Sequence, residues 1–340
     1  MDKTSKPEWK VPWRGMLLAL TVSAAALVVI FWQISNPKDV LQELRAYPLR
    51  YFLGAQFFVL AAWLVDGQRI GTLARALGQR IPWWELAIIL GAANFLTLVT
   101  PFAGGGGALI VYYLYRRGLK SSQATAVVLG GGLAGQSALA LLGLVTSSIL
   151  RGVPGDLASY FTAVKIGALV YLLILSGLQV GIIKSERLFK WVFSKTGSKS
   201  RSAAWVAGFR SNYEFLITKR SGHYAVCVAT AFTYYAVYYL GSFLLLSGFG
   251  VFHPWLRFAV AVLFGVAPVF SPIPGGAGLS EGISWAVLDS VLQPDELASF
   301  IVLWRTVVFY IPILLGGAVF VFLVMRWASG SNITKGSGPY

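Results

Sequence analysis

Long apolar segments recur along this chain, and they restrict its fold more than any other feature. About 18 or more consecutive apolar residues are enough to cross a bilayer as a helix. Only 12% of the 340 residues are charged, and the mean hydropathy of +0.69 is far above that of a soluble domain. The sequence therefore predicts an all-α polytopic membrane protein with about six full transmembrane helices. Their expected positions are 16–32, 51–65, 124–150, 157–183, 224–248 and 297–325.

The ends of the chain are expected to be short tails around one transmembrane domain. Basic residues precede the first apolar run, as in a secretory signal, but that run is long and no small-residue cleavage pattern follows it. We therefore interpret it as a transmembrane helix. The predicted organisation is a cytoplasmic tail at 1–14, a single domain at 15–328 and a second cytoplasmic tail at 329–340.

The distribution of basic residues predicts how the chain is threaded through the membrane. Lys and Arg near helix ends favour the cytoplasmic side. With the N-terminus inside, 21 of the 28 Lys and Arg residues become cytoplasmic, including those at 69–80, and five lie outside. This split holds only if the apolar regions 84–115 and 258–292 leave on the side where they enter. Each is therefore predicted to be a re-entrant helical hairpin in the cytoplasmic membrane, and both termini are predicted to be cytoplasmic.

A basic loop at 184–220 separates the two halves of the predicted domain. It holds nine Lys and Arg residues, with Trp191, Phe193, Trp205 and Phe209 among them. One interpretation is a solvated connector that follows the positive-inside rule. The other is an amphipathic segment lying on the anionic inner leaflet.

Each predicted hairpin contains a break rich in proline and glycine, and the two breaks match. Residues 100–107 read TPFAGGGG, and residues 271–278, which lie 171 positions later, read SPIPGGAG. Similar apolar runs flank both, so we predict an inverted repeat with one copy at about 67–150 and the other at about 250–325. The residues that carry this match are Pro101, Gly104, Gly105 and Gly107 in the first half, and Pro272, Pro274, Gly275, Gly276 and Gly278 in the second.

The physics of the bilayer gives these breaks a function. Non-helical backbone at membrane depth is tolerated only where protein buries it or where it lines a wet cavity. Glycine permits a positive φ and close approach of another group, and proline ends a helix. Two hairpin tips that meet near the midplane would form a substrate site of the transporter type. The alternative is that the glycines only permit tight packing of helices.

Glu281 is an acid three residues after the second break. At the start of a helix, a carboxylate can cap free N–H groups and interacts favourably with the helix dipole. In the other interpretation it faces a cavity and meets a cationic headgroup or carries a proton. A cap should largely survive Glu281→Gln, whereas a charge-dependent role should not.

Arg305 and Gln136 are polar residues within the long apolar runs that follow the two breaks. Arg305 is expected either to pair with Glu281 or snorkel to the surface, or to bind a lipid phosphate through its guanidinium fork. Gln136 lies at nearly the corresponding level of the first half. Both are candidate substrate-binding residues.

The sequence offers little for other kinds of chemistry. One cysteine excludes an internal disulfide, and two histidines with one cysteine are too few for a zinc site of the usual His and Cys type. The net charge of +15 has no aromatic and basic nucleic-acid module beside it and is better explained by membrane topology. We expect no metal, cofactor or nucleic acid, and membrane lipids as partners, with a homodimer as one possible assembly.

The second break and the helix after it resemble a known family. Pro272-x-Pro274-Gly-Gly-x-Gly278-x-x-Glu281, followed by Arg305 and Tyr310-Ile-Pro312, resembles the lysylphosphatidylglycerol synthetase transmembrane-region family, also called the flippase-like domain family. The resemblance covers about residues 15–328. Its best-known member is the membrane half of the multiple peptide resistance factor, which moves aminoacylated phosphatidylglycerol between leaflets while a separate soluble domain makes that lipid.

The resemblance implies that the chain flips an amphiphilic lipid, such as an aminoacylated or other phospholipid, and is not itself an enzyme. The last apolar run ends close to Tyr340, so no synthetase domain is expected. Many members carry a Gly-Glu pair and an Arg after the first break, and this chain has no charge there until Arg116, so its headgroup contacts are expected to differ. The alternative function is that of a membrane enzyme or accessory subunit acting on lipid-linked glycan or hopanoid precursors.

Overall fold

The structure, a computed structural model, describes residue 21 and residues 37–100, 104–149, 155–184, 201–251, 253–266 and 276–328. Over these residues the chain forms helices and no strands. The helices are α2 (Pro37–Ala46), α3 (Leu49–Ala76), α4 (Trp83–Val99), α5 (Gly104–Arg116), α6 (Ser121–Ile149), α7 (Gly155–Lys184), α9 (Arg201–Glu214), α10 (Ser221–Gly248), α11 (Pro254–Val266), α12 (Leu279–Leu288), α13 (Pro294–Arg305) and α14 (Ile311–Ala328). A π-helical turn, Phe215–Lys219, follows α9, and another, Thr306–Tyr310, joins α13 to α14.

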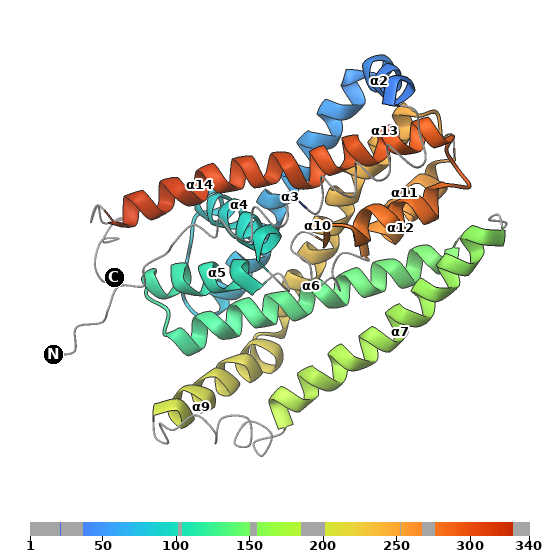
Figure 1. The fold of residues 1–340 in the computed structure, drawn as a ribbon. Helices are drawn as coiled ribbons and strands as arrows, with labels where there is room; N and C mark the ends of the chain where they lie inside the picture. The colour runs from blue at the N-terminus through green and yellow to red at the C-terminus, as the bar shows by residue number, and fades with distance from the viewer. Residues whose placement is uncertain are drawn as a thin grey trace.

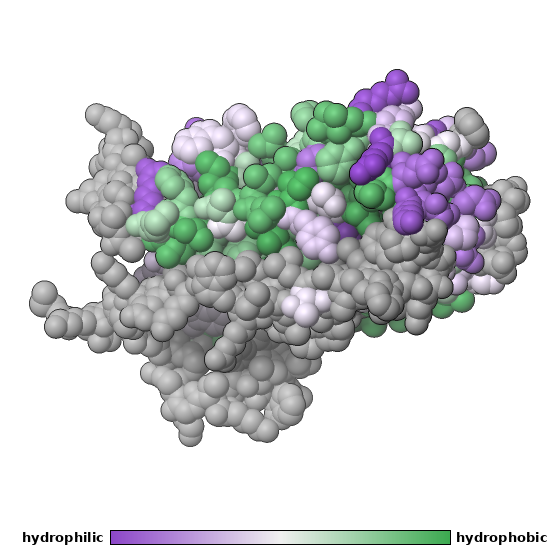
Figure 2. All heavy atoms as spheres, turned by 45° about the horizontal axis from the view of Figure 1, so that its top comes forward, coloured by the Kyte–Doolittle hydropathy of each residue, from purple (hydrophilic) through white to green (hydrophobic). Residues whose placement is uncertain are grey.

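The prediction of an all-α polytopic membrane protein is confirmed. Within the described residues, five helices are long and apolar enough to cross a membrane, and they include five of the six predicted spans. They are Leu49–Ala76, Ser121–Ile149, Ala158–Lys184, Ser221–Gly248 and Pro294–Trp327. The sixth predicted span, 16–32, lies outside the described residues. On the face shown in Figure 2, hydrophobic side chains form a broad central area, with hydrophilic ones gathered towards the ends.

Two pairs of short helices lie between two long ones. In Figure 1, α6 and the continuous helix α13–α14 run in opposite directions, and the pairs α4–α5 and α11–α12 occupy the layer between them. The first pair contacts α6 and α14, and the second contacts α6 and α13. The ends at which each pair is broken are directed towards the middle of the molecule (Figure 1). The predicted pairing of half-helices around each break is therefore present.

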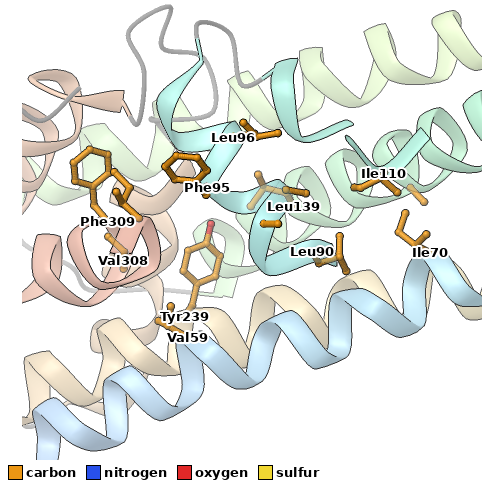
Figure 3. Close-up of a cluster of buried hydrophobic side chains, with 14 of the residues drawn as sticks. Val59, Ile70, Leu90, Phe95, Leu96, Ile110, Leu139, Tyr239, Val308 and Phe309 are labelled. Carbon is orange, nitrogen blue, oxygen red and sulfur yellow. The ribbon is translucent and has the colours of Figure 1, made fainter. Parts of the chain in front are cut away.

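Small residues allow the central helices to approach closely, as is common in membrane proteins. A Cβ on Gly241 of α10 would lie 3.1 Å from the carbonyl oxygen of Ala55 in α3, and one on Gly316 of α14 would lie 2.5 Å from that of Gly91 in α4. The core side chains labelled in Figure 3 are aliphatic or aromatic, and Tyr239 of α10 is the one among them with a hydroxyl, which points into the middle of the core.

The second span is longer than predicted. The sequence predicts a short span that ends at Val65, with cytoplasmic basic residues from Arg69 onwards. Instead, α3 continues without a break to Ala76, and its second half is mostly buried. The earlier prediction is wrong because Asp66 and Arg69 pair with each other, so their charges did not mark the end of the helix.

The basic loop is also more structured than either interpretation suggested. Residues 185–200, with Trp191 and Phe193, lie outside the described residues. The remainder forms α9, which packs on α6 and buries Phe209, while Trp205 donates a hydrogen bond to Ser121 Oγ at 3.2 Å. Phe209 is therefore buried against the protein, whereas Trp205 is half-buried and bonded to the start of α6.

Candidate functional site

Glu281 and Arg305 form an ion pair in the interior of the protein. Arg305 donates from Nε to Glu281 Oε1 at 2.7 Å and from Nη2 to Oε2 at 2.6 Å. The two side chains are 1% and 2% exposed, and Arg305 is the largest fully buried side chain of the described residues. The pair is bidentate, so the guanidinium fork is matched by both carboxylate oxygens. Of the outcomes considered for Arg305, pairing with Glu281 is the one seen, and snorkelling to the surface is not.

The second break holds Glu281 in place through its backbone. Gly276 and Gly278 have φ values of +65° and +81°, which a residue with a side chain rarely adopts. This geometry directs the N–H of Gly278 to Glu281 Oε2 at 2.8 Å, at the start of α12. Glu281 thus caps its helix and pairs with Arg305 at the same time. Pro272, Pro274 and Gly275 lie outside the described residues.

Aromatic and hydroxyl groups surround the ion pair. The guanidinium carbon of Arg305 lies 4.9 Å from the ring centre of Phe309, and Trp304 donates to Ser242 Oγ of α10 at 3.1 Å. Within the described part of the chain, the fully buried Ser280 Oγ next to Glu281 has no hydrogen-bond partner. The helix widens into the π-helical turn immediately after Arg305, and π-helical turns are frequent at functional sites. The site therefore combines a buried charge pair with an unsatisfied donor and an irregular helix.

The first break has a different local geometry from the second. Gly104 begins α5 directly, so Gly105 and Gly107 are helical, and a positive φ is not needed there. Thr100 Oγ1 accepts the N–H of Gly105 at 3.0 Å and so takes the capping role. Of the two properties expected of these glycines, positive φ is not used in this half, and close approach is. A Cβ on Gly105 would lie 2.9 Å from Thr100 Cγ2, and one on Gly106 would lie 2.6 Å from the carbonyl oxygen of Ala93 in α4. Pro101 lies outside the described residues.

The structure joins only part of the predicted substrate site. It brings Gly278, Glu281 and Arg305 into direct contact. Gln136 instead accepts a hydrogen bond from Tyr171 of α7 at 3.2 Å. No hydrogen bond or ion pair described in the structure connects Gln136, Gly105 or Gly107 with the Glu281–Arg305 pair.

A second ion pair inside the bundle was missed by the sequence analysis. Arg69 Nε donates to Asp66 Oδ1 at 2.5 Å, and its Nη1 donates to the carbonyl oxygen of Gly131 in α6. The two side chains are 14% and 15% exposed. The spacing of three residues places both charges on one helix face and so indicates an ion pair. From the sequence alone, Arg69 is instead counted with the cytoplasmic charges. The partner in α6 is 62 residues away and could not be read from the local sequence.

Comparison with known proteins places the chain in context. The model of a family described as the lysylphosphatidylglycerol synthase TM region matches residues 16–316, which include α2 to α13 and both breaks. No curated protein matched the sequence. Within the described residues, no group of three or more His, Cys, Asp or Glu side chains is arranged to hold a metal ion.

Proposed function

The chain belongs to the lysylphosphatidylglycerol synthase transmembrane-region family, and we propose that it moves an amphiphilic lipid between the leaflets of the cytoplasmic membrane. The observation that carries the proposal is the buried Glu281–Arg305 pair at the break before α12. An ionisable group within a membrane domain is costly and is by default a candidate for a transport pathway. A protein with a purely structural core would be expected to avoid it.

The chemistry of the pair suits a phospholipid headgroup. A guanidinium presents a planar fork to a phosphate as readily as to a carboxylate. In the structure Glu281 occupies that fork, so an entering phosphate would compete with it for Arg305. The displaced carboxylate would then meet a cationic group of the lipid or take up a proton. An aminoacylated phospholipid, the type of lipid that the family name suggests, carries both a phosphate and such a cation.

The short lengths of these helices support a transport pathway formed by hairpins that enter the membrane from opposite sides. Helices α5, α11 and α12 have 13, 13 and 10 residues, which is too few to cross a hydrocarbon core of about 30 Å. We propose that the two pairs are re-entrant hairpins that enter from opposite sides and form an inverted repeat. Their broken ends would then meet the lipid headgroup near the midplane.

Thiol labelling tests this topology. In a Cys227→Ala background, cysteines introduced at Arg80 and Arg116 should react with an impermeant reagent from one side of the membrane. Cysteines at His253 and Ser290 should react from the other side. All four positions lie at exposed helix ends that flank the hairpins. Labelling of the two ends of one hairpin from opposite sides would show that this hairpin crosses the membrane.

A liposome assay tests the function itself. Purified protein in phosphatidylcholine vesicles with a trace of NBD-labelled phosphatidylglycerol should expose inner-leaflet probe to dithionite, so that quenching passes well beyond the outer half. The alternatives, an enzyme or an accessory subunit acting on lipid-linked glycan or hopanoid precursors, predict quenching that stops at the outer half. Protein-free vesicles and vesicles with heat-unfolded protein provide the controls.

A further inference from the structure

Four tyrosines of α10 have hydroxyl groups for which the described residues provide no hydrogen bond. Tyr234, Tyr235, Tyr238 and Tyr239 form two stacks, with ring centres 6.0 Å apart for Tyr234 and Tyr238 and 6.1 Å apart for Tyr235 and Tyr239. No hydrogen bond among the described residues involves these four hydroxyls, and none of them is among the buried polar atoms that lack a partner. Tyr234, Tyr235 and Tyr238 are half-buried, and Tyr239 is buried. The hydroxyls are therefore accessible to water or to a polar ligand.

The row extends from one ion pair to the other. Helix α10 packs along α3, which carries Asp66 and Arg69, and also contacts α13, which carries Arg305. The charges of Asp66 and Arg69 act on Tyr235, and the charge of Arg305 acts on Tyr238. One turn further along α10, Ser242 binds Trp304, the neighbour of Arg305. Successive turns of α10 therefore pass first the Asp66–Arg69 pair and then the Glu281–Arg305 pair.

Arg69 and Arg305 both lie deep in the bundle, Arg69 nearer to one end and Arg305 nearer to the other. At 1.5 Å per residue, Gly131, which binds Arg69, is about 15 Å from the start of α6 at Ser121. Arg305 is about 16 Å from the start of α13 at Pro294. Since α6 and α13–α14 start at opposite ends of the molecule (Figure 1), the arginines lie on either side of the middle.

Arg69 has the capacity to bind a further anion. A guanidinium has five N–H donors, and the two hydrogen bonds described for Arg69 leave some of them for a ligand. The side chain keeps 14% of its surface accessible. Two glycines of α6 leave room for the guanidinium of Arg69, because a Cβ on Gly131 or Gly135 would lie only 3.3 Å from Arg69 Nη1.

An apolar cavity adjoins this end of the row. It has a volume of about 550 Å³, lies between α6 and α7, and is lined by apolar residues such as Leu139, Val164 and Ile174 together with Tyr171. Tyr171 also binds Gln136 and lies within electrostatic range of Tyr235. The volume is in the range of ligand pockets. Leu139 in the cavity wall is one helical turn from Gly135, which lies beside Arg69. An apolar cavity with a guanidinium one turn away matches the two parts of a phospholipid.

We propose that Arg69 is a second phosphate-binding station for the transported lipid, and that the tyrosines of α10 form a hydrogen-bonding path by which the phosphate passes between Arg69 and Arg305. The acyl chain lies between α6 and α7 while the phosphate is at Arg69. Neutral hydroxyls bind a phosphate without holding it as tightly as an arginine, so they permit movement between the two charged stations. This path rests on the proposed lipid transport and assigns a defined route to it.

Removing hydroxyls tests the path without disturbing the packing. Tyr235→Phe and Tyr238→Phe keep the stacked rings and delete hydroxyl groups that form no hydrogen bond with the described residues. The matched control is Tyr224→Phe on the same helix, whose hydroxyl donates to Gln179 Oε1 at 2.8 Å, away from the row. In the liposome assay with NBD-labelled phosphatidylglycerol, the double variant should be about tenfold slower than the wild type, because hydrogen bonds to a charged group are lost. Its thermal unfolding should be unchanged, and the control should transport normally.

A second variant tests the station itself. Asp66→Asn with Arg69→Gln removes both charges together, and it should slow transport of the same probe by a similar factor while thermal unfolding shows that the fold is kept. Transport at the wild-type rate by the double tyrosine variant would overturn the path and leave the hydroxyls as water ligands. If the wild type moves no lipid, the proposed function fails first, and the path fails with it.

Discussion

Glu281→Gln should lower the free energy of unfolding by about 3–5 kcal/mol, the usual cost of breaking a buried ion pair from one side. The substitution leaves the guanidinium of Arg305, which is 2% exposed, without its counter-charge. A guanidinium cannot release a proton to become neutral. If Glu281 were only a helix cap, this substitution would cost little stability. The ion pair with Arg305 is the reason to expect a large loss.

The chain supplies a matched control in Glu296. This residue also caps a helix from its third position, accepting the N–H of Gln293 at 3.0 Å, but no salt bridge to it is described. Glu296→Gln should therefore cost little. Unfolding of both variants in detergent separates the ion pair from the cap, and equal losses would contradict the contribution that we assign to Arg305.

Neutralising both partners should recover most of the lost stability. In Glu281→Gln with Arg305→Met no unpaired charge remains in the interior, and replacement of buried ion pairs by neutral groups is often tolerated. Arg305→Met alone should cost less than Glu281→Gln, because a carboxyl group can take up a proton. A double variant less stable than both single variants would contradict this account.

The two breaks should respond with opposite signs to the same substitution. Gly107 and Gly278 occupy the same position of the repeated motif, yet Gly278 has a φ of +81° and Gly107 is helical. Gly278→Ala should cost about 1–3 kcal/mol, because alanine is strained in that backbone region. Gly107→Ala should be neutral or stabilise by up to about 1 kcal/mol, since its Cβ would meet only Val128 at 3.7 Å.

Thermal unfolding of the two alanine variants in detergent measures this difference, and lipid transport provides a second readout. Gly278→Ala should also slow transport, because the N–H of Gly278 holds Glu281 in its paired position. Equal effects of the two substitutions on stability would mean that the breaks have the same local structure. The two halves of the proposed inverted repeat would then be more alike than the structure shows.

Features that depend on local sequence could be predicted, and features that depend on distant contacts could not. The length of the apolar runs identified the five spans in the described residues, and the matching glycines identified both breaks. The pairing of Glu281 with Arg305 was among the predicted outcomes because a break places the acid at a helix start and the arginine follows on the next long helix. The charges of Asp66 and Arg69, which directly follow an apolar run, instead indicated that the span ends there. Only the contact with Gly131 explains why they are held inside.

The tyrosine row illustrates the same limit. Four tyrosines between residues 234 and 239 read as part of an apolar span, and a helix makes them neighbours at a spacing of four. The path that we propose for them depends on charged side chains of α3 and α13, which are distant in the sequence. Similarly, the local sequence of the basic loop does not reveal that α9 packs on α6 and buries Phe209.

The account is tested most directly by the rate at which the Glu281→Gln, Arg305→Met double variant moves NBD-labelled phosphatidylglycerol in liposomes. This variant should be folded and should lack only the charges of the pair at the second break. At equal protein density we expect the wild type to expose inner-leaflet lipid to dithionite and the double variant to expose almost none. Equal rates would show that the ion pair has no part in moving lipid, and would contradict the central claim.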